Sequence, residues 1–298
     1  MSLLVLDPGL SSRLVDFGRP NSRGLGVPVG GAGDRAGLIL GNGLVGNPPD
    51  ALALEIALRG PTLRADAEVG CVLFGAPFDM STARQKPRSG RTFTLAAGEE
   101  LHITGTPTGM RAYFCVRGGF EAPLILGGHS GLDDVRRGDR LRCAASRIAT
   151  RFLAERPDLS SDGPVRCVPG LQADWFNVAE FYGQTFTVSP ALNRMGVRLQ
   201  GQPLTLPERE LVSEPVCPGA VQVTSDGQCI VLGVDGQTIG GYPKIAHVIQ
   251  ADLDRLGQLR PGAPVRFIPV PHDEARRLFL QREDALQAWW RRLTISLE

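Results

Sequence analysis

The chain has 298 residues, of which 42% are hydrophobic, and its formal net charge at pH 7 is +1. This length favours about two domains, and the near-neutral charge argues against nucleic acid and anionic membranes as partners. The 37 glycines and 23 prolines are too many for a helical bundle, so the composition favours a turn-rich β protein.

Targeting signals and metal-site spacings are not apparent in the sequence. No stretch approaches the ~18 consecutive apolar residues of a membrane span, and the opening MSLLVLDPG lacks the basic segment of a signal peptide. The six cysteines are scattered without a CxxC pair, and the four histidines share no ligand-like spacing. We therefore expect a cytoplasmic protein with reduced thiols and no metal site.

The first half of the chain predicts one helix followed by many strands. A short strand is expected at residues 3–6, and a helix at residues 36–45 with Asp34 as its N-cap. The GxGxxG letters at residues 41–46 fall inside this helix rather than after a strand, so they do not predict a dinucleotide site. Between residues 52 and 119 the apolar period is close to two, which predicts consecutive strands of a barrel or sandwich.

The second half predicts a linker, another β-rich unit and a terminal helix. Residues 155–164 are polar with two prolines and form the best linker candidate. A short helix is expected at residues 173–181. Apolar side chains at spacings of three and four predict a helix over residues 273–293.

Residues 211–250 contain the most informative pattern. Two apolar runs, at 219–223 and 229–234, flank the letters TSDG and predict a hairpin. The loop QTIGGYPK follows, in which Gly240 and Gly241 permit close approach of the backbone or positive φ, and Pro243 stiffens the exit. Lys244 is one of only two lysines among 32 basic residues, and lysine suits a phosphate or an oxyanion. The alternative is a surface lysine that ends a tight turn.

Several motifs together resemble one family over residues 3–270. They are DFGR at 16–19, GVPVGGAGD at 26–34, SEPV at 213–216 and QTIGGYPKIA at 237–246. The chain resembles the C subunit of 5-oxoprolinase, whose family is also called biotin-dependent carboxyltransferase, allophanate hydrolase subunit 2 or KipA-like. The resemblance implies a mainly β fold with two cyclophilin-like β-barrel units, a few short helices and a C-terminal helix. The expected ranges are 1–160, 165–271 and 272–298.

The resemblance also implies a function. The chain would be the C subunit of an ATP-dependent 5-oxoprolinase, a hydrolase of cyclic amides that converts 5-oxo-L-proline to L-glutamate with a KipI-like B subunit and an A subunit. ATP with Mg would be the co-substrate. Neither lysine lies in a Met-Lys-Met context, so no covalent biotin is expected on this chain. The alternatives are a carboxyltransferase component of the urea carboxylase or allophanate hydrolase type, and a non-catalytic KipA-like antagonist of a kinase inhibitor.

Some positions depart from the family pattern. GGAGD stands where SGAMD is usual, Asn193 replaces an Asp before Arg-Met-Gly, and Cys229 replaces a Pro. The glycine-rich loop after Gly127 is shorter than usual. If that loop lines the site, turnover itself is in question, which favours the non-catalytic alternative.

Opening a lactam with ATP implies phosphorylation of the amide oxygen and then attack by water. Lys244 and Arg194 would supply positive charge for the phosphoryl group. Glu214 would be the general base for water. The structural alternatives are that Arg194 bridges carbonyls between strands and that Glu214 is only a turn carboxylate.

The remaining candidates would bind the substrate. Gln222 and Gln237 would hold its polar edges, and Gly240 and Gly241 would offer backbone N–H groups to an oxyanion. Gln222 alternates with two valines, so it should point away from them, into solvent or a site. Tyr242 is the last candidate, with packing as its alternative role.

Overall fold

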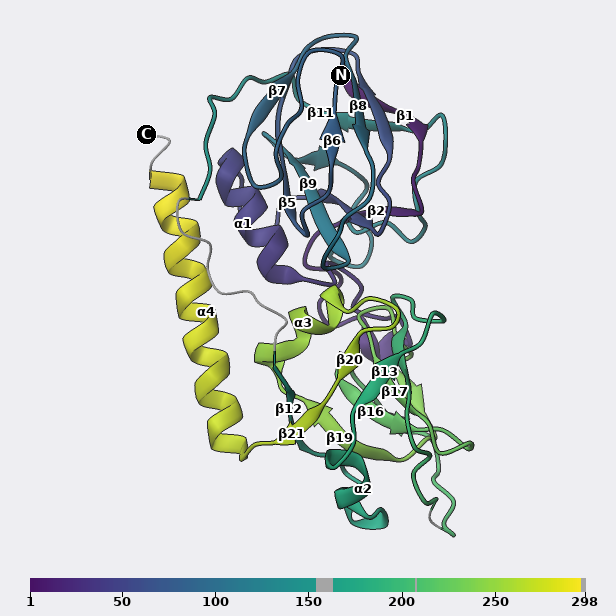
Figure 1. The fold of residues 1–298 in the computed structure, drawn as a ribbon. Helices are drawn as coiled ribbons and strands as arrows, with labels where there is room; N and C mark the ends of the chain where they lie inside the picture. The colour runs from purple at the N-terminus through teal and green to yellow at the C-terminus, as the bar shows by residue number, and fades with distance from the viewer. Residues whose placement is uncertain (154–162, 207, 296–298) are drawn as a thin grey trace. The chain divides into compact units, whose positions relative to one another are not determined.

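The computed structural model describes residues 1–153, 163–206 and 208–295. It divides into two compact units (Figure 1). The first comprises Met1–Pro20, Gly30–Leu159 and Ala285–Glu298, and the second comprises Asn21–Val29 and Ser160–Asp284. Both units are built mainly from strands, and with the long C-terminal helix they confirm the predicted fold class. Most of the predicted linker at 155–164 lies outside the described residues, so the predicted domain ranges stay a prediction.

The first unit is a pair of sheets around one core. A six-stranded sheet has the order β10-β11-β1-β4-β8-β6, and a five-stranded sheet has the order β2-β3-β9-β5-β7. The strands of the first sheet are β10 (Phe120–Glu121), β11 (Arg140–Cys143), β1 (Ser2–Asp7), β4 (Thr62–Ala65), β8 (Glu100–Ile103) and β6 (Met80–Ser81). Those of the second are β2 (Ser11–Val15), β3 (Ala53–Ala57), β9 (Arg111–Val116), β5 (Val69–Gly75) and β7 (Phe93–Leu95). Leu3, Leu63, Leu73 and Phe114, drawn from both sheets, belong to one buried cluster.

Helix α1 (Arg35–Val45) covers the other face of the five-stranded sheet. The Asp34 side chain accepts a hydrogen bond from Gly37 N at 2.9 Å, and Gly46 ends the helix at φ 79°, so the predicted helix and its N-cap are confirmed. A Cβ at Gly41 would lie 2.8 Å from Cys115 Sγ. The glycine of this GxGxxG sequence therefore serves close packing of the helix on β9.

The DFGR sequence forms a buried polar network in the first unit. Asp16 accepts hydrogen bonds from Ser130 Oγ at 2.5 Å, His129 N at 2.6 Å and Gly18 N at 2.7 Å. Arg19 donates to the Ser130 carbonyl at 2.5 Å. These bonds satisfy buried polar groups, which is required for a loop to remain in a core. Ser130 is thus a structural hydroxyl that joins two distant loops.

The second unit is a strongly curled sheet. Its eight strands have the order β20-β13-β14-β17-β16-β19-β12-β21. The bounds are β20 (Pro264–Val265), β13 (Phe186–Val188), β14 (Gly196–Gln200), β17 (Cys229–Leu232), β16 (Ala220–Val223), β19 (Lys244–Val248), β12 (Val165–Pro169) and β21 (Phe267–Pro269). The first and last strands of this order are separated in sequence only by Arg266, so the sheet nearly closes into a barrel. Its interior holds a cluster that includes Val221, Val223 and Phe267.

The hairpin predicted in the second unit is confirmed. Strands β16 and β17 pair in antiparallel fashion, with Val223 opposite Cys229. Gly227 closes the turn at φ 76°, and Thr224 N donates to Gln228 O at 2.9 Å. A local Asp-Gly turn between β-forming residues was enough to specify this register.

The described residues form few helices, of which α4 is the longest. They are η1 (Arg23–Leu25), η2 (Ala173–Trp175), α2 (Val178–Tyr182), η3 (Gln250–Asp252), α3 (Leu253–Gln258) and α4 (His272–Ile295). Helix α4 confirms the predicted terminal helix, and Trp290 Nε1 donates to Asn47 O at 3.1 Å. Its residues divide between the units at Asp284 and Ala285. No helix within the described residues is long and apolar enough to cross a membrane.

Candidate functional site

Of the residues predicted for the site, Gln222 and Lys244 lie on the eight-stranded sheet of the second unit. The strand pairing aligns Arg198 with Ile230, Ile230 with Gln222, and Gln222 with Lys244. Paired residues of neighbouring strands share a face, and successive residues alternate between faces. Because Val221 belongs to the barrel core, this row lies on the opposite face of the sheet.

A small two-stranded sheet lies beside this row. Strand β15 (Glu214–Pro215) pairs with β18 (Ile239–Gly240), which places Glu214 opposite Gly240. A Cβ at Gly240 would lie 2.4 Å from Gln237 Nε2 and 2.9 Å from Gln222 Nε2. Both amide nitrogens therefore approach the same side of Gly240.

The two glycines contribute differently from one another. Neither Gly240 nor Gly241 has positive φ. Of the two predicted reasons for a diglycine, close approach is the one that applies, and it applies most strongly at Gly240. A Cβ at Gly241 would meet Ser213 Oγ at 3.1 Å, a tighter contact than usual but one that a hydroxyl can relieve.

A cavity of about 170 Å³ opens over this face, with Gln222, Gln237, Tyr242 and Arg198 among its lining residues. Gln222 is only 2% exposed, yet its Nε2 has no hydrogen-bond partner among the described residues. Tyr242 is 43% exposed. The cavity thus contains a buried donor that a bound acceptor would satisfy.

Lys244, which is aligned with Gln222, and Glu214, which is opposite Gly240, form an ion pair. Lys244 is 5% exposed, so it is not the surface lysine of the alternative interpretation. Apart from this contact, the Lys244 ammonium has no acceptor in the described part of the chain. Gln172 connects the two, since its Nε2 donates to Glu214 at 3.0 Å and its Oε1 accepts from Lys244 N at 3.0 Å.

The neighbours of Glu214 keep its carboxylate ionised. Contact with the Lys244 ammonium, helped by the Gln172 amide, lowers the pKa of Glu214 below its usual value of 4.5. An ionised carboxylate can accept a proton, but a lowered pKa makes it a weak base. With its pKa lowered, Glu214 serves mainly as the partner that holds the Lys244 ammonium in place.

We predict that Glu214→Gln reduces stability at neutral pH but hardly at acid pH. Because the folded-state pKa is depressed, the pair contributes stability above about pH 4.5 that is lost as the pH falls through the folded-state value. The expected loss is about 0.5–1 kcal/mol, small because the carboxylate is 28% exposed. Urea unfolding at about pH 7 and pH 3.5 measures it. Glu210→Gln, an exposed carboxylate, is the control, and an equal loss at both pH values would contradict the expectation.

Comparison with known proteins identifies the family. The family model of the carboxyltransferase domain, subdomain A and B, matches residues 25–269. The chain belongs to the carboxyltransferase-domain family. The resemblance inferred from the motifs is thereby confirmed.

Relatives of this carboxyltransferase-domain protein are parts of enzymes. It is 34% identical to the C subunit of 5-oxoprolinase from Escherichia coli K12, over 92% of this chain and 93% of that protein. It is 33% identical to the protein of the same name in Haemophilus influenzae, over 94% of each chain. The crystal structure of Kluyveromyces lactis urea carboxylase matches with a TM-score of 0.86 at 26% identity, over 97% of this chain but 29% of that one.

Arg194 of the carboxyltransferase-domain protein is engaged elsewhere. Its guanidinium binds Asp235 through two hydrogen bonds, at 2.8 and 2.9 Å, and its carbonyl accepts from Asp235 N at 3.1 Å. The cavity lining includes its neighbours Asn193 and Met195. The structure therefore gives Arg194 a role in the turn after β17, and its substrate contact stays a prediction.

Two residues near the site were not identified from the sequence. Arg198 is exposed, lines the cavity and extends the row of aligned residues. Its position between Val197 and Leu199 was a signal for an outward-facing side chain. Gln172 gave no local signal, because its contacts lie 42 and 72 residues away.

No group of three or more His, Cys, Asp or Glu within the described ranges is arranged to hold a metal ion. The expected requirement for Mg with ATP remains a prediction, since ATP itself can bring that ion. The polar side chains that line the cavity are three amides (Asn193, Gln222 and Gln237), Arg198 and Tyr242, which suit an acceptor or an anion better than a metal.

Proposed function

We propose that this chain is the C subunit of an ATP-dependent 5-oxoprolinase, a hydrolase that opens 5-oxo-L-proline to L-glutamate. It would work in the cytoplasm with a KipI-like B subunit and an A subunit, with ATP and Mg as co-substrate and no covalent biotin on this chain. The 34% identity that extends over 93% of the Escherichia coli relative supports this assignment. The site chemistry supports it independently.

The observation that carries the proposal is the unsatisfied Gln222 amide. A buried donor without a partner destabilises the protein by about 1–3 kcal/mol. A ligand that accepts a hydrogen bond from this donor removes that penalty, which favours binding in the cavity. The amide nitrogens of Gln222 and Gln237 approach the same side of Gly240. A single ligand oxygen, such as a lactam carbonyl, can accept from both.

The size and charge of the cavity fit a small acid. Ligand sites usually measure about 300–1,000 Å³, and a cavity of about 170 Å³ fits only a small molecule or the end of a larger one. Arg198 at the lining supplies a positive charge for the carboxylate of 5-oxoproline. ATP would then bind in the assembled enzyme outside this cavity.

In this proposal the remaining residues stabilise charge during lactam opening. The Lys244 ammonium faces the phosphoryl group on the amide oxygen, where positive charge is needed most. ATP gives its terminal phosphoryl group to the amide oxygen and leaves as ADP. As the ammonium turns toward the substrate, Glu214 regains basicity and accepts a proton from the water that adds to the amide carbon. The carbon–nitrogen bond then breaks, the nitrogen leaves as the amine, and a second water hydrolyses the resulting acyl phosphate to glutamate and phosphate. Backbone N–H groups of Gly240 and Gly241 bind the oxyanion.

Arg194 and Tyr242 complete the proposal as substrate contacts. Tyr242 lines the cavity, and its exposure leaves it free to close over a bound molecule. Arg194 holds the neighbouring turn through Asp235 and would act on the substrate from there.

Gln222→Leu should separate function from stability. With A and B subunits, 5-oxoproline and ATP, we expect glutamate formation to fall about 10- to 100-fold, the loss of one or two ligand hydrogen bonds. The free energy of unfolding should stay unchanged or rise by about 1 kcal/mol, because an unsatisfied amide is removed. Glutamate assay and urea unfolding measure the two effects.

Gln228→Leu is the matched control. Its amide is satisfied by Gly201 N and O at 3.1 and 3.3 Å, so its loss should destabilise the chain by about 1 kcal/mol and leave the rate unchanged. Wild-type turnover in Gln222→Leu would refute the substrate contact assigned to Gln222, and no glutamate from the wild-type assembly would refute the proposed function.

A carboxyltransferase is the second candidate. It is favoured by the family model and by the likeness to urea carboxylase over 97% of this chain. Transfer of labelled carboxyl from carboxybiotin to urea, without dependence on 5-oxoproline, would select it. A tight complex with the B subunit and no turnover in either assay would instead support the non-catalytic KipA-like antagonist.

A further inference from the structure

One cysteine of this chain differs from the other five. Cys71, Cys115, Cys143, Cys167 and Cys229 are buried, and Cys217 is exposed. Burial raises the pKa of the Cys143 thiol to about 11 and that of Cys229 to about 12. Such thiols are unreactive near neutral pH, because the thiolate is the nucleophile.

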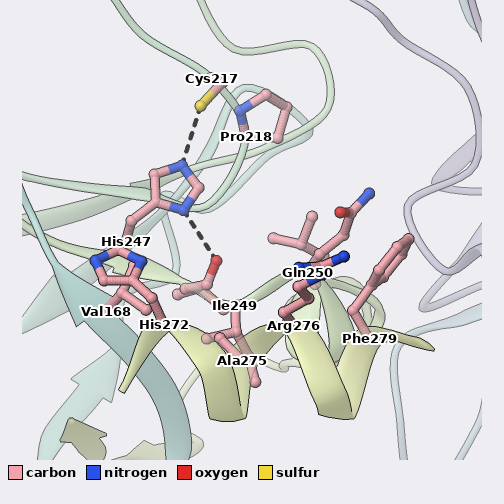
Figure 2. A pocket seen from close by; sticks show the side chains of 12 residues that line it. Val168, Cys217, Pro218, His247, Ile249, Gln250, His272, Ala275, Arg276 and Phe279 are labelled. Atoms are coloured by element: carbon pink, nitrogen blue, oxygen red, sulfur yellow. Dashed lines mark hydrogen bonds between the residues drawn. The ribbon is translucent and has the colours of Figure 1, made fainter. Parts of the chain in front are cut away.

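Cys217 contacts a histidine that is oriented to accept its proton. His247 Nε2 lies 3.0 Å from Cys217 Sγ, and His247 Nδ1 lies 3.0 Å from the Val248 carbonyl (Figure 2). A carbonyl can only accept, so the neutral ring carries its hydrogen on Nδ1 and leaves Nε2 as an acceptor for the thiol. A nucleophile, a base and a group that orients the base are thereby assembled.

The charges around this pair favour its ionised form. The hydrogen bond with His247 lowers the pKa of Cys217 against the opposing effect of burial, and Arg23 adds to the lowering. Burial opposes the imidazolium, but the Cys217 sulfur and the Val248 carbonyl raise the pKa of His247 overall. Both changes favour thiolate beside imidazolium.

The pair opens onto the larger of the two cavities described for the second unit. This cavity measures about 580 Å³, within the usual range of about 300–1,000 Å³ for ligand sites. Val168, Ile249, Leu253 and Phe279 give it apolar walls. On α4, the exposed His272 and Arg276 add polar and cationic groups to the same lining (Figure 2).

We propose that Cys217 and His247 form a second reactive site, which takes a small disulfide with an apolar body and a carboxylate. The apolar body lies against Phe279 and the carboxylate faces Arg276. His247 Nε2 takes the Cys217 proton, and the Cys217 sulfur bonds to the nearer sulfur of the ligand. The ligand's own S–S bond breaks, and its other half leaves as a thiolate. Cys217 is thus oxidised to a mixed disulfide while the ligand's leaving half is reduced.

The test uses the full chain and the aromatic disulfide 5,5′-dithiobis(2-nitrobenzoate), which carries a carboxylate on each ring. One thiol per chain should react rapidly, and Cys217→Ser should abolish that phase. Between about pH 8 and pH 6.5 an ordinary thiol slows about 25-fold as its thiolate disappears. The wild-type rate should fall less than about fivefold, whereas His247→Asn should restore the ordinary decline.

Comparing the negatively charged disulfide with a neutral disulfide tests the predicted class of ligand. Arg276→Ala should slow the dicarboxylate about three- to tenfold at low salt and leave the rate of 4,4′-dithiodipyridine unchanged. Arg277→Ala, one position along the exposed helix, is the control. An ordinary pH profile for the wild type would overturn the proposal without any variant, and an equal effect of Arg276→Ala on both probes would overturn the assigned ligand class.

Discussion

Replacing Lys244 with alanine is expected to lower turnover of the assembled enzyme about 100- to 1,000-fold, the usual effect of removing a preorganised charge from a reacting oxygen. The ammonium is buried, and Glu214 and Gln172 hold the residue that carries it. It therefore needs little reorganisation to meet a developing negative charge. The assay is glutamate formation from 5-oxoproline and ATP with the A and B subunits present.

Lys86→Ala is the control for this experiment. Lys86 is the other lysine of the sequence and is exposed, so its loss should change neither rate nor stability. Lys244→Arg should also lose most activity, because a planar guanidinium does not fit the place of a compact ammonium. Full activity in Lys244→Ala would refute the proposed role of this residue.

The largest effect on stability is expected at Asp252. Its carboxylate is completely buried and accepts hydrogen bonds from Arg166 N at 2.8 Å, Arg166 Nη2 at 2.5 Å and Arg255 Nη1 at 3.2 Å. Asp252→Ala removes the carboxylate from Arg255, whose side chain is 12% exposed, and from Arg166, whose side chain is 31% exposed. Removing one partner of a buried pair costs about 3–5 kcal/mol, and the partial exposure of Arg166 places the expected loss at the lower end, about 3 kcal/mol. Urea unfolding of the full chain measures the loss.

Glu274→Ala is the matched control in the same unit. Glu274 also pairs with an arginine, Arg277, but both side chains are well exposed. Exposed pairs contribute little, since water screens them and the long side chains lose entropy. Its removal should leave the unfolding curve in place. A loss at Asp252 no larger than that at Glu274 would contradict the expectation.

Features specified by neighbouring residues could be predicted from the sequence. Helix α1 follows from the Asp34 cap and the Gly46 exit, and the β16–β17 hairpin follows from its Asp-Gly turn. The orientation of Gln222 away from the core follows from simple alternation with Val221. Each of these signals is contained within a few residues of chain.

Features that depend on distant contacts could not be predicted. Gln172 connects Glu214 and Lys244 across separations of 42 and 72 residues. The partner of Arg194 is 41 residues away, and the sequence alone does not say that Asp235 holds its guanidinium. Cys217 and His247 are separated by 30 residues, and neither has a local pattern that indicates the other.

Both ends of the segment 214–217 contact side chains of β19. Glu214 contacts Lys244 at one end of the segment and Cys217 contacts His247 at the other, the same three-residue offset on each side. Pro215 lies between them, and its fixed φ limits the conformational freedom of the segment. A rotation that lengthens one contact therefore disturbs the other. A substitution in the Glu214–Lys244 pair is therefore expected to change the reactivity of Cys217, and a substitution at Cys217 or His247 to shift the Lys244 ammonium.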